Sequence, residues 1–261
     1  DGRTLQVASC HHYRDQWAKA FDITYEDGNA EQQYCHQTTY GMSERLLGAV
    51  VGIHGDDDGL IMPPAIAPIQ VAIIPVMPDK DPAVGIAIAD VCRKLDAVGI
   101  RYKVDDRDLR PGTKYYDCEI KGIPLRLDIG PRDVKNGHAF SAKRTGGKQP
   151  LPLDNIVAEV QSALSEIADE LRSRSAASAE NIIQPLPAFK QVDGKWKMDG
   201  EVENDKIYEM PFDGSDADAE IIERATSLSF LGDSTSEYPE DMNCAVTGKT
   251  TKRRVLLSRS Y

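Results

Sequence analysis

Cysteine pairs of the CxxC type, long apolar runs and the common glycine-rich nucleotide motifs are all missing from this 261-residue sequence. Its five cysteines are odd in number and form no CxxC pair, which favours a reducing cytoplasm over a disulfide framework. No run of about 18 apolar residues occurs, so we expect no membrane-spanning helix. Neither GxxxxGK followed by Ser or Thr nor GxGxxG is present, so any nucleotide would bind through a different architecture.

An initial methionine and a signal-peptide layout are also missing, because the sequence opens at Asp1 in mid-pattern. We therefore interpret the chain as the C-terminal part of a longer polypeptide. Acidic residues outnumber basic ones by 42 to 31, and the resulting net charge of −11 argues at first against nucleic-acid binding. The segment 101–149 nevertheless holds 12 Lys and Arg against 7 Asp and Glu, a balance of +5 that leaves −16 for the rest. Such a basic segment is a candidate phosphate-binding surface, and the alternative is a charged surface with no partner.

An apolar run, Leu46 to Ile53, follows a polar and glycine-containing stretch, 37–43, that has neither helical nor strand periodicity. The run predicts a buried helix, and Ser43 is placed to cap its N-terminus. Arg45 then falls in the first turn, where a cation opposes the helix dipole and is costly to bury unpaired. A phosphate would suit its guanidinium, and the alternative is an ion pair with a neighbouring carboxylate.

Strands and helices alternate in residues 67–175, which predicts a small, mostly parallel sheet covered by helices. Apolar residues recur at helical spacing between Val84 and Val98, and again between Ile156 and Leu171. Residues 1–66 and 176–261 form two further expected domains, and the Ser- and Ala-rich segment 173–180 is expected to be a linker or a frayed helix end. The expected fold class is therefore α/β and α+β, with several domains.

Three consecutive aspartates, Asp56 to Asp58, lie between two glycines after the apolar run. They could hold a divalent cation through carboxylate oxygens. A simple turn after the helix explains them as well, and we favour the turn.

Several motifs carry a family resemblance. The sequence reads HQTTYGMSERLLGA at 36–49, HGDDDGLIMPP at 54–64, APIQVAIIP at 67–75 and RSY at its end. These motifs resemble motif 3 and the following segments of class II aminoacyl-tRNA synthetases, specifically prolyl-tRNA synthetases of the archaeal and eukaryotic type. The resemblance continues through DDRDLRPGTKYYDCEIKGIPLRLDIGPRD at 105–133 and covers most of the chain. It implies the end of an antiparallel class II catalytic domain, an α/β anticodon-binding domain and a small α+β C-terminal domain.

The resemblance also implies roles for individual residues. Gln6 and Ser9 take positions that contact ATP, and Arg45 takes the position of the motif 3 arginine on the ATP phosphates. His11 and Ser43 take positions next to the proline substrate. For His11 alone, a hydrogen-bonded structural histidine is the alternative.

The implied reaction is ATP-dependent activation of L-proline to prolyl-adenylate, followed by transfer to tRNA(Pro). Mg²⁺ would accompany ATP, and the enzyme would be a cytoplasmic homodimer without a membrane segment. Positioning and charge stabilisation would drive the chemistry without a protein nucleophile. Motifs 1 and 2 are absent from this sequence, and motif 2 supplies the arginine on the α-phosphate, so we expect the chain alone to be inactive. A stand-alone tRNA-binding or regulatory module, and a threonyl or histidyl specificity, are the alternatives.

The basic segment would contact unpaired anticodon bases through polar side chains and stacking. The candidates from the sequence are Arg107, Arg110, Lys114, Tyr115, Glu119, Lys121 and Arg132. The alternative is that Asp105, Arg107 and Glu119 form internal ion pairs that fix the loops.

Two further expectations concern the C-terminal domain. The family often carries a four-cysteine zinc site there, but only Cys244 is present and Thr247 stands where the next cysteine would fall. One thiolate does not make a closed tetrahedral site, so we expect no structural zinc and no other metal site in the chain. By the resemblance, the terminal Tyr261 would lie close to the catalytic pocket, with a disordered tail as the alternative.

Overall fold

A computed structural model describes residues 3–260 of the chain. The expectation for Tyr261 lies outside the described residues. Residues Leu47–Ala176 form one compact unit, and the described residues before and after it form a second one. The expected three-part division at 66/67 and 175/176 stays a prediction. The mixed α/β and α+β class is confirmed.

The unit 47–176 is built on a five-stranded sheet with the order β6-β5-β7-β8-β9. The strands are β5 (Val71–Pro75), β6 (Tyr102–Val104), β7 (Leu125–Ile129), β8 (His138–Lys143) and β9 (Lys148–Pro152). Strands β6, β5 and β7 pair in parallel, whereas β8 and β9 are antiparallel additions. The expectation of a mostly parallel sheet is therefore only half right. Strand β8 runs antiparallel to β7, and a turn at Gly146-Gly147 then reverses the chain again and adds an unexpected edge strand, β9.

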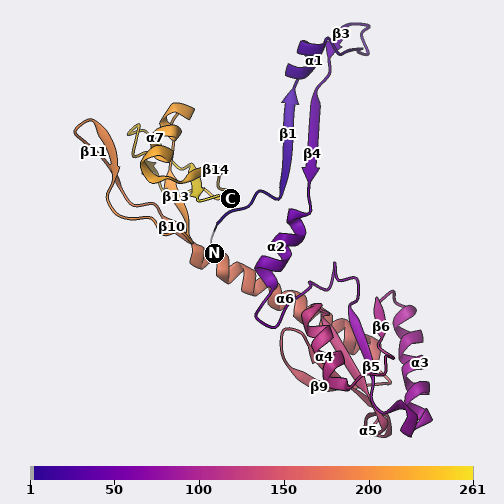
Figure 1. Cartoon of the computed structure of the whole chain (residues 1–261). Helices are drawn as coiled ribbons and strands as arrows, with labels where there is room; N and C mark the ends of the chain where they lie inside the picture. The colour runs from indigo at the N-terminus through magenta and orange to yellow at the C-terminus, as the bar shows by residue number, and fades with distance from the viewer. Residues whose placement is uncertain (1–2, 261) are drawn as a thin grey trace. The chain divides into compact units, whose positions relative to one another are not determined.

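Helices cover both faces of this sheet (Figure 1). They are α3 (Pro82–Asp96), α4 (Pro111–Ile120), α5 (Pro131–Lys135) and α6 (Ile156–Ile182), with a short 3-10 turn, η1, at Pro78–Lys80. Alternate residues of β7, Leu125, Leu127 and Ile129, join α3 and α6 in the main core. On the opposite face, Cys118 of α4 packs against Ala72 and Ile74 of β5. Helix α6 continues through 173–180, so of the two expectations for this segment the helix end is closer, and the linker is wrong.

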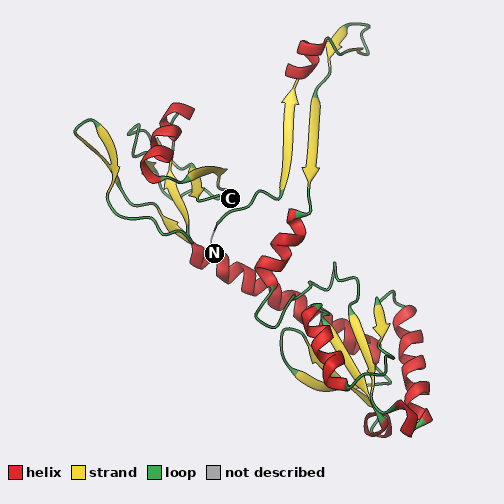
Figure 2. Cartoon of the chain, viewed as in Figure 1, coloured by secondary structure: helices red, strands yellow, loops and turns green. Residues whose placement is uncertain are grey.

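In the second unit, the N-terminal part is a narrow antiparallel ribbon. It contains β1 (Ala8–Arg14), α1 (Gln16–Phe21), β2 (Thr24–Glu26), β3 (Gln32–Tyr34) and β4 (Gln37–Met42). Strand β1 pairs only with β4, and Figure 2 shows the two as a long hairpin arm. The stretch 37–43, expected to have no regular structure, is thus mostly a strand, because pairing with β1 supplies the hydrogen bonds that its polar sequence does not predict.

Helix α2 (Arg45–His54) forms as expected, but none of its described residues is buried. Leu47 is 62% exposed and Ile53 is 60% exposed. The prediction of a buried helix is therefore wrong for this chain. A two-stranded ribbon is too narrow to cover an apolar helix, which needs a wider sheet or other helices against it.

The C-terminal part of this unit is a four-stranded sheet with the order β10-β13-β17-β14 and one helix. Its elements are β10 (Ile183–Pro185), β11 (Phe189–Val192), β12 (Lys195–Met198), β13 (Ile207–Pro211), α7 (Asp216–Thr226), β14 (Ser229–Asp233), β15 (Met242–Asn243), β16 (Thr250–Thr251) and β17 (Arg254–Ser258). Strands β11 and β12 form a hairpin around Asp193-Gly194. Ile222 of α7 and Leu257 of β17 are fully buried in the core of this part.

Candidate functional site

The register of β1 and β4 sets the positions of two expected site residues. Ser9 lies opposite Gly41, and His11 lies opposite Thr39. A Cβ atom at Gly41 would come within 3.3 Å of the Ser9 hydroxyl, so the glycine leaves room for this side chain. The exposed His11 ring stacks on Tyr13, with 5.4 Å between the ring centroids.

Arg45 is the first residue of α2, directly after the turn that leaves β4. Its Nη1 donates a hydrogen bond to the backbone oxygen of Gln6 at 3.3 Å, and its backbone N–H reaches the Ser43 hydroxyl at 3.4 Å. Ser43 thus lies at the helix N-terminus, where the sequence predicted it. Among residues 3–260, Arg45 has no carboxylate within ion-pair distance. The alternative, an ion pair between Arg45 and a neighbouring carboxylate, is therefore not present among these residues.

A hollow of about 690 Å³ surrounds this guanidinium. It is lined by Thr4, Leu5, Gln6, Ala8, Arg45, Ser229, Phe230, Leu231 and Ser260, all from the same unit. A guanidinium has five N–H donors, and only the bond to Gln6 engages those of Arg45 within the described chain. The remaining donors border this hollow, and none of the described residues places a carboxylate within ion-pair distance of them. Of the expected site residues, Gln6, Ser43 and Arg45 are in contact, whereas no hydrogen bond in the described part joins Ser9 or His11 to them.

In the other unit, two of the expected RNA-contacting residues hold a loop in place. Arg107 donates to both carboxylate oxygens of Asp105, at 2.8 and 2.7 Å, and to Asp117 at 2.8 Å. These bonds hold the pKa of the Asp105 carboxyl below its usual value. Lys114 is 5% exposed and donates to the Asp105 backbone oxygen at 2.9 Å. The internal ion pair left open by the sequence is therefore present for Arg107, and Lys114 is a buried structural residue.

Of the other five candidates, Tyr115 is half-buried, and the remaining four, Arg110, Glu119, Lys121 and Arg132, are exposed. Glu119 and Lys121 lie at the C-terminal end of α4, and Arg132 is exposed on α5. Glu119 lies 3.9 Å from Arg126, a long ion pair. Lys121 shares a cavity of about 110 Å³ with Lys103 and Arg107.

Sequence reasoning missed Arg126 and Asp128 on β7. The Arg126 guanidinium lies over the Tyr115 ring, 3.7 Å from its centroid, and its Nε donates to Asp128 at 3.1 Å. Burial raises the pKa of the Asp128 carboxyl, although Arg126 opposes the shift. The signal was available, because the strand reads Leu-Arg-Leu-Asp-Ile and its charged residues share the face opposite the core.

The same face continues over β8 and β9. Asp128 lies opposite Phe140 in the register, and Phe140 lies opposite Pro150. Directly paired residues share a face of the sheet, so Phe140 lies on the same face as Asp128 and Arg126. Phe140 is 37% exposed, unusual for an aromatic ring in the middle of a sheet. The open face of β8 and β9 is therefore a partly apolar surface, and it borders the buried Arg126, which is 7% exposed.

Comparison with known proteins identifies the chain. A family model described as the anticodon binding domain matches residues 70–163. The proline–tRNA ligase of Thermococcus kodakarensis is 40% identical over 268 positions, covering 100% of this chain and 54% of the relative. That of Methanosarcina mazei is 39% identical over 264 positions, with the same two shares. The chain is homologous to the C-terminal half of proline–tRNA ligases.

A solved structure supports this relationship to the ligases. The Giardia lamblia prolyl-tRNA synthetase, described as a complex with prolyl-adenylate, superposes with a TM-score of 0.84 and 26% identity. It covers 100% of this chain and 56% of that protein. The chain thus spans about half the length of the ligases it matches. The match to the anticodon binding domain lies within the unit 47–176, and the motif 3 residues lie at the start of α2.

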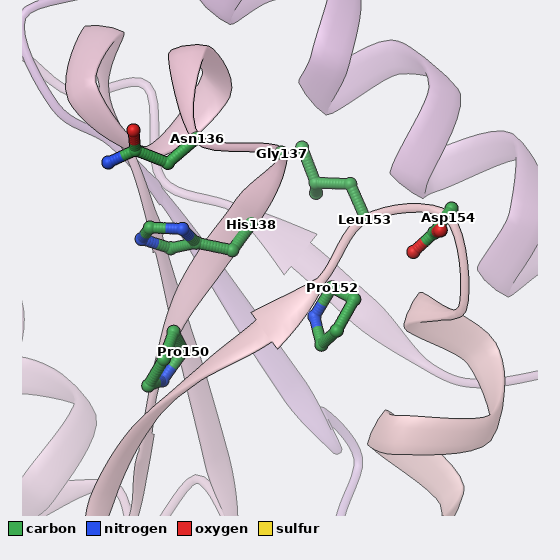
Figure 3. A pocket seen from close by; sticks show the side chains of 7 residues that line it. All are labelled: Asn136, Gly137, His138, Pro150, Pro152, Leu153 and Asp154. Atoms are coloured by element: carbon green, nitrogen blue, oxygen red, sulfur yellow. The ribbon is translucent and has the colours of Figure 1, made fainter.

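A hollow of about 670 Å³ lies at one end of the open face in this anticodon-binding domain. Figure 3 shows the side chains of His138, Pro150 and Pro152 around it. His138 Nε2 lies 3.3 Å from the Asp133 carboxylate. His138 and Phe140 are two residues apart on β8, so they share a face, and the hollow extends the surface described above.

Metal ligands do not gather in the described part of the chain. Across residues 3–260, no group of three or more His, Cys, Asp or Glu side chains could hold a metal ion. Cys244 is a buried free thiol. Asp56 belongs to a turn closed by a bridge to Gly59, and its carboxylate binds Arg144. The turn, which the sequence favoured over a cation site, is present. No span of the described chain is long and apolar enough for a membrane helix.

Proposed function

We propose that the chain forms the C-terminal half of a proline–tRNA ligase, which activates L-proline with ATP and transfers it to tRNA(Pro). The observation that carries this proposal is the Arg45 guanidinium, which has no carboxylate partner in the described chain and faces a hollow next to Gln6. In a complete ligase, these free donors would bind the ATP phosphates in bidentate fashion. Held in place by the Gln6 carbonyl, the side chain would stabilise charge that develops on the departing pyrophosphate.

The other residues of the proposed site would position substrates. Gln6 and Ser9 would contact ATP, while His11 and Ser43 would lie next to proline. The described residues offer no set of side chains for Mg²⁺, so we assign the ion no ligand in this chain and no step of the reaction. The homodimer and the cytoplasmic location implied by the resemblance belong to the same proposal.

We further propose that the open face of β8 and β9 binds the anticodon loop of tRNA(Pro). Glu119, Lys121 and Arg132 would supply polar contacts at its edge, with the exposed Phe140 on the face. Arg126 is 7% exposed and lies over the Tyr115 ring, so it would support this surface from below. Exposed aromatic rings and guanidinium planes stack on unpaired bases. Arg107 and Lys114 would instead hold the adjoining loop, because both are engaged with Asp105.

Pyrophosphate exchange tests the enzymatic half of the proposal. A complete ligase, with this chain as its C-terminal half, should exchange pyrophosphate into ATP with proline far better than with any other amino acid. Exchange with threonine or histidine instead would contradict the proline specificity. No exchange with any amino acid, together with retained tRNA binding, would support a stand-alone tRNA-binding module.

A binding measurement tests the RNA-contacting face on the chain itself. Phe140→Leu should weaken binding of a tRNA(Pro) anticodon stem-loop about tenfold in fluorescence anisotropy, because it removes one stacked ring. Phe21→Leu is the matched control, since Phe21 is 65% exposed on α1 in the other unit. Equal affinities of the two variants would refute the proposed face.

A further inference from the structure

The connector after α2, residues 55–62, is built into the anticodon-binding unit. The Leu60 N–H donates to the Ile120 carbonyl at 3.2 Å, and the Met62 N–H donates to the Gly122 carbonyl at 3.0 Å. Ile120 is the last residue of α4, and Gly122 follows two residues later. The connector therefore runs along the end of the helix that carries Glu119.

Close packing leaves little freedom to this connector. A Cβ atom at Gly59, where φ is +130°, would come within 2.7 Å of the Ile120 Cα. Ile61 is 1% exposed and packs against Ile167 and Leu171 of α6. A displacement of the α4 end would therefore displace the connector with it.

One side chain joins the connector to α4 and to the β8–β9 turn. Arg144 follows β8, and its side chain is 5% exposed. Its Nε donates to the backbone oxygens of Leu60 and Glu119, both at 3.1 Å, and Nη2 donates to the Gly59 oxygen at 3.2 Å. Its two Nη atoms also bind the Asp56 carboxylate, Nη1 at 2.9 Å. This fork holds the pKa of the Asp56 carboxyl below its usual value.

Arg144 lies between the open sheet face and the connector that follows α2. Arg144 borders a cavity of about 210 Å³ together with Glu119, Arg126 and Lys148, at the edge of the open sheet face. Protein acceptors surround its guanidinium, which suits a positioning role. At the other end of the same contacts, Asp56 is two residues beyond the end of α2, the helix that Arg45 begins.

We propose that Arg144 and Asp56 form a latch that couples anticodon binding to the placement of the motif 3 helix. The inference rests on the proposed function. Contacts of the RNA with the end of α4 and the β8–β9 turn would move the Arg144 guanidinium, and the Asp56 carboxylate would carry that movement to the end of α2. Arg144 is thus a positioning residue, since it acts through the connector and not on a substrate.

The latch is tested in the complete ligase with Asp56→Asn and Arg144→Lys. Pyrophosphate exchange without tRNA should stay within about twofold of wild type, whereas kcat for tRNA charging should fall about tenfold with little change in KM for tRNA. Arg172→Lys is the matched control, because Arg172 makes an exposed pair with Asp169 on α6. Melting temperatures of all variants show whether folding is preserved, and the milder Asp56→Asn remains informative if Arg144→Lys does not fold.

A tRNA with one anticodon base replaced supplies the decisive comparison. In the wild-type enzyme this base replacement should lower kcat for tRNA charging. In the Asp56→Asn variant the same replacement should lower kcat hardly further, because the contact between Asp56 and Arg144 is already weakened. If the two losses multiply, or if exchange falls as much as charging, the latch is refuted. Failure of wild type itself to exchange with proline would overturn the proposed function and the latch together, so the two failures are distinguishable.

Discussion

Replacing Ile61 by alanine tests whether the connector belongs to the folded core of the anticodon-binding unit. The side chain is 1% exposed, and its neighbours Ile167 and Leu171 are 0% and 3% exposed. Loss of three carbons at about 0.8 kcal/mol each, with a cavity left against helix α6, gives a destabilisation of about 3 kcal/mol. Urea unfolding of the chain, followed by far-ultraviolet circular dichroism, should show this loss in the transition of the unit 47–176.

Ile66→Ala is the matched control, because Ile66 lies in the same connecting region but is 51% exposed. We expect it to cost no more than about 0.5 kcal/mol, the usual range for a surface substitution. Amide hydrogen exchange gives a local measurement, since Leu60 and Met62 donate to the end of α4. Their exchange should accelerate strongly in Ile61→Ala and hardly at all in Ile66→Ala. Equal stability losses, or fast exchange of both amides in wild type, would refute the view of a rigid connector.

Two further substitutions test local contacts of the same unit. Gly122→Ala should destabilise by at least about 1 kcal/mol more than Gly137→Ala in urea unfolding, because both have φ near +65° but only at Gly122 would the new Cβ meet the Leu60 oxygen, at 2.5 Å. Equal losses would remove that contact from the account. Asp105→Asn should cost about 1–3 kcal/mol at pH 7, since Arg107 lowers the pKa of this carboxyl from 3.8 in the folded state. Because the pKa of Asp105 is lower in the folded state, its carboxylate contributes stability above pH 3.8, and this contribution is lost as the pH falls through the folded pKa. The difference in unfolding free energy between wild type and Asp105→Asn should therefore narrow at pH 3. A difference that stays constant with pH would contradict this prediction.

Local patterns in the sequence predicted the regular elements of the anticodon-binding unit. The helical spacing from Val84 corresponds to α3, and a left-handed glycine, Gly99 with φ of +71°, follows the end of this helix. Strand β4 and the exposure of α2 were not predictable in the same way. Both depend on which other segments pair with or cover them, and a residue's own neighbours in sequence carry no such information.

The candidate site shows the same limit. A charged residue at the start of an apolar helix marks Arg45 as a candidate in the sequence. Whether a carboxylate neutralises its guanidinium depends on segments far away in the sequence. The alternation on β7 could have revealed Arg126, whereas nothing in the sequence links Asp56 to Arg144, 88 positions later. Likewise, Arg107 and Lys114 resemble RNA-binding residues in the sequence, and only the structure shows both engaged with Asp105.

The central claim is that the Arg45 guanidinium serves ATP, and one measurement tests it most directly. Proline-dependent pyrophosphate exchange should be compared between the complete ligase, its Arg45→Ala variant and an Arg93→Ala control, where the arginine makes only an exposed pair with Asp90. Removing one preorganised donor to a developing charge typically lowers the rate about 100-fold or more, so exchange by Arg45→Ala should fall to this extent while the control keeps the wild-type rate. An Arg45→Ala enzyme within threefold of wild type would contradict the account.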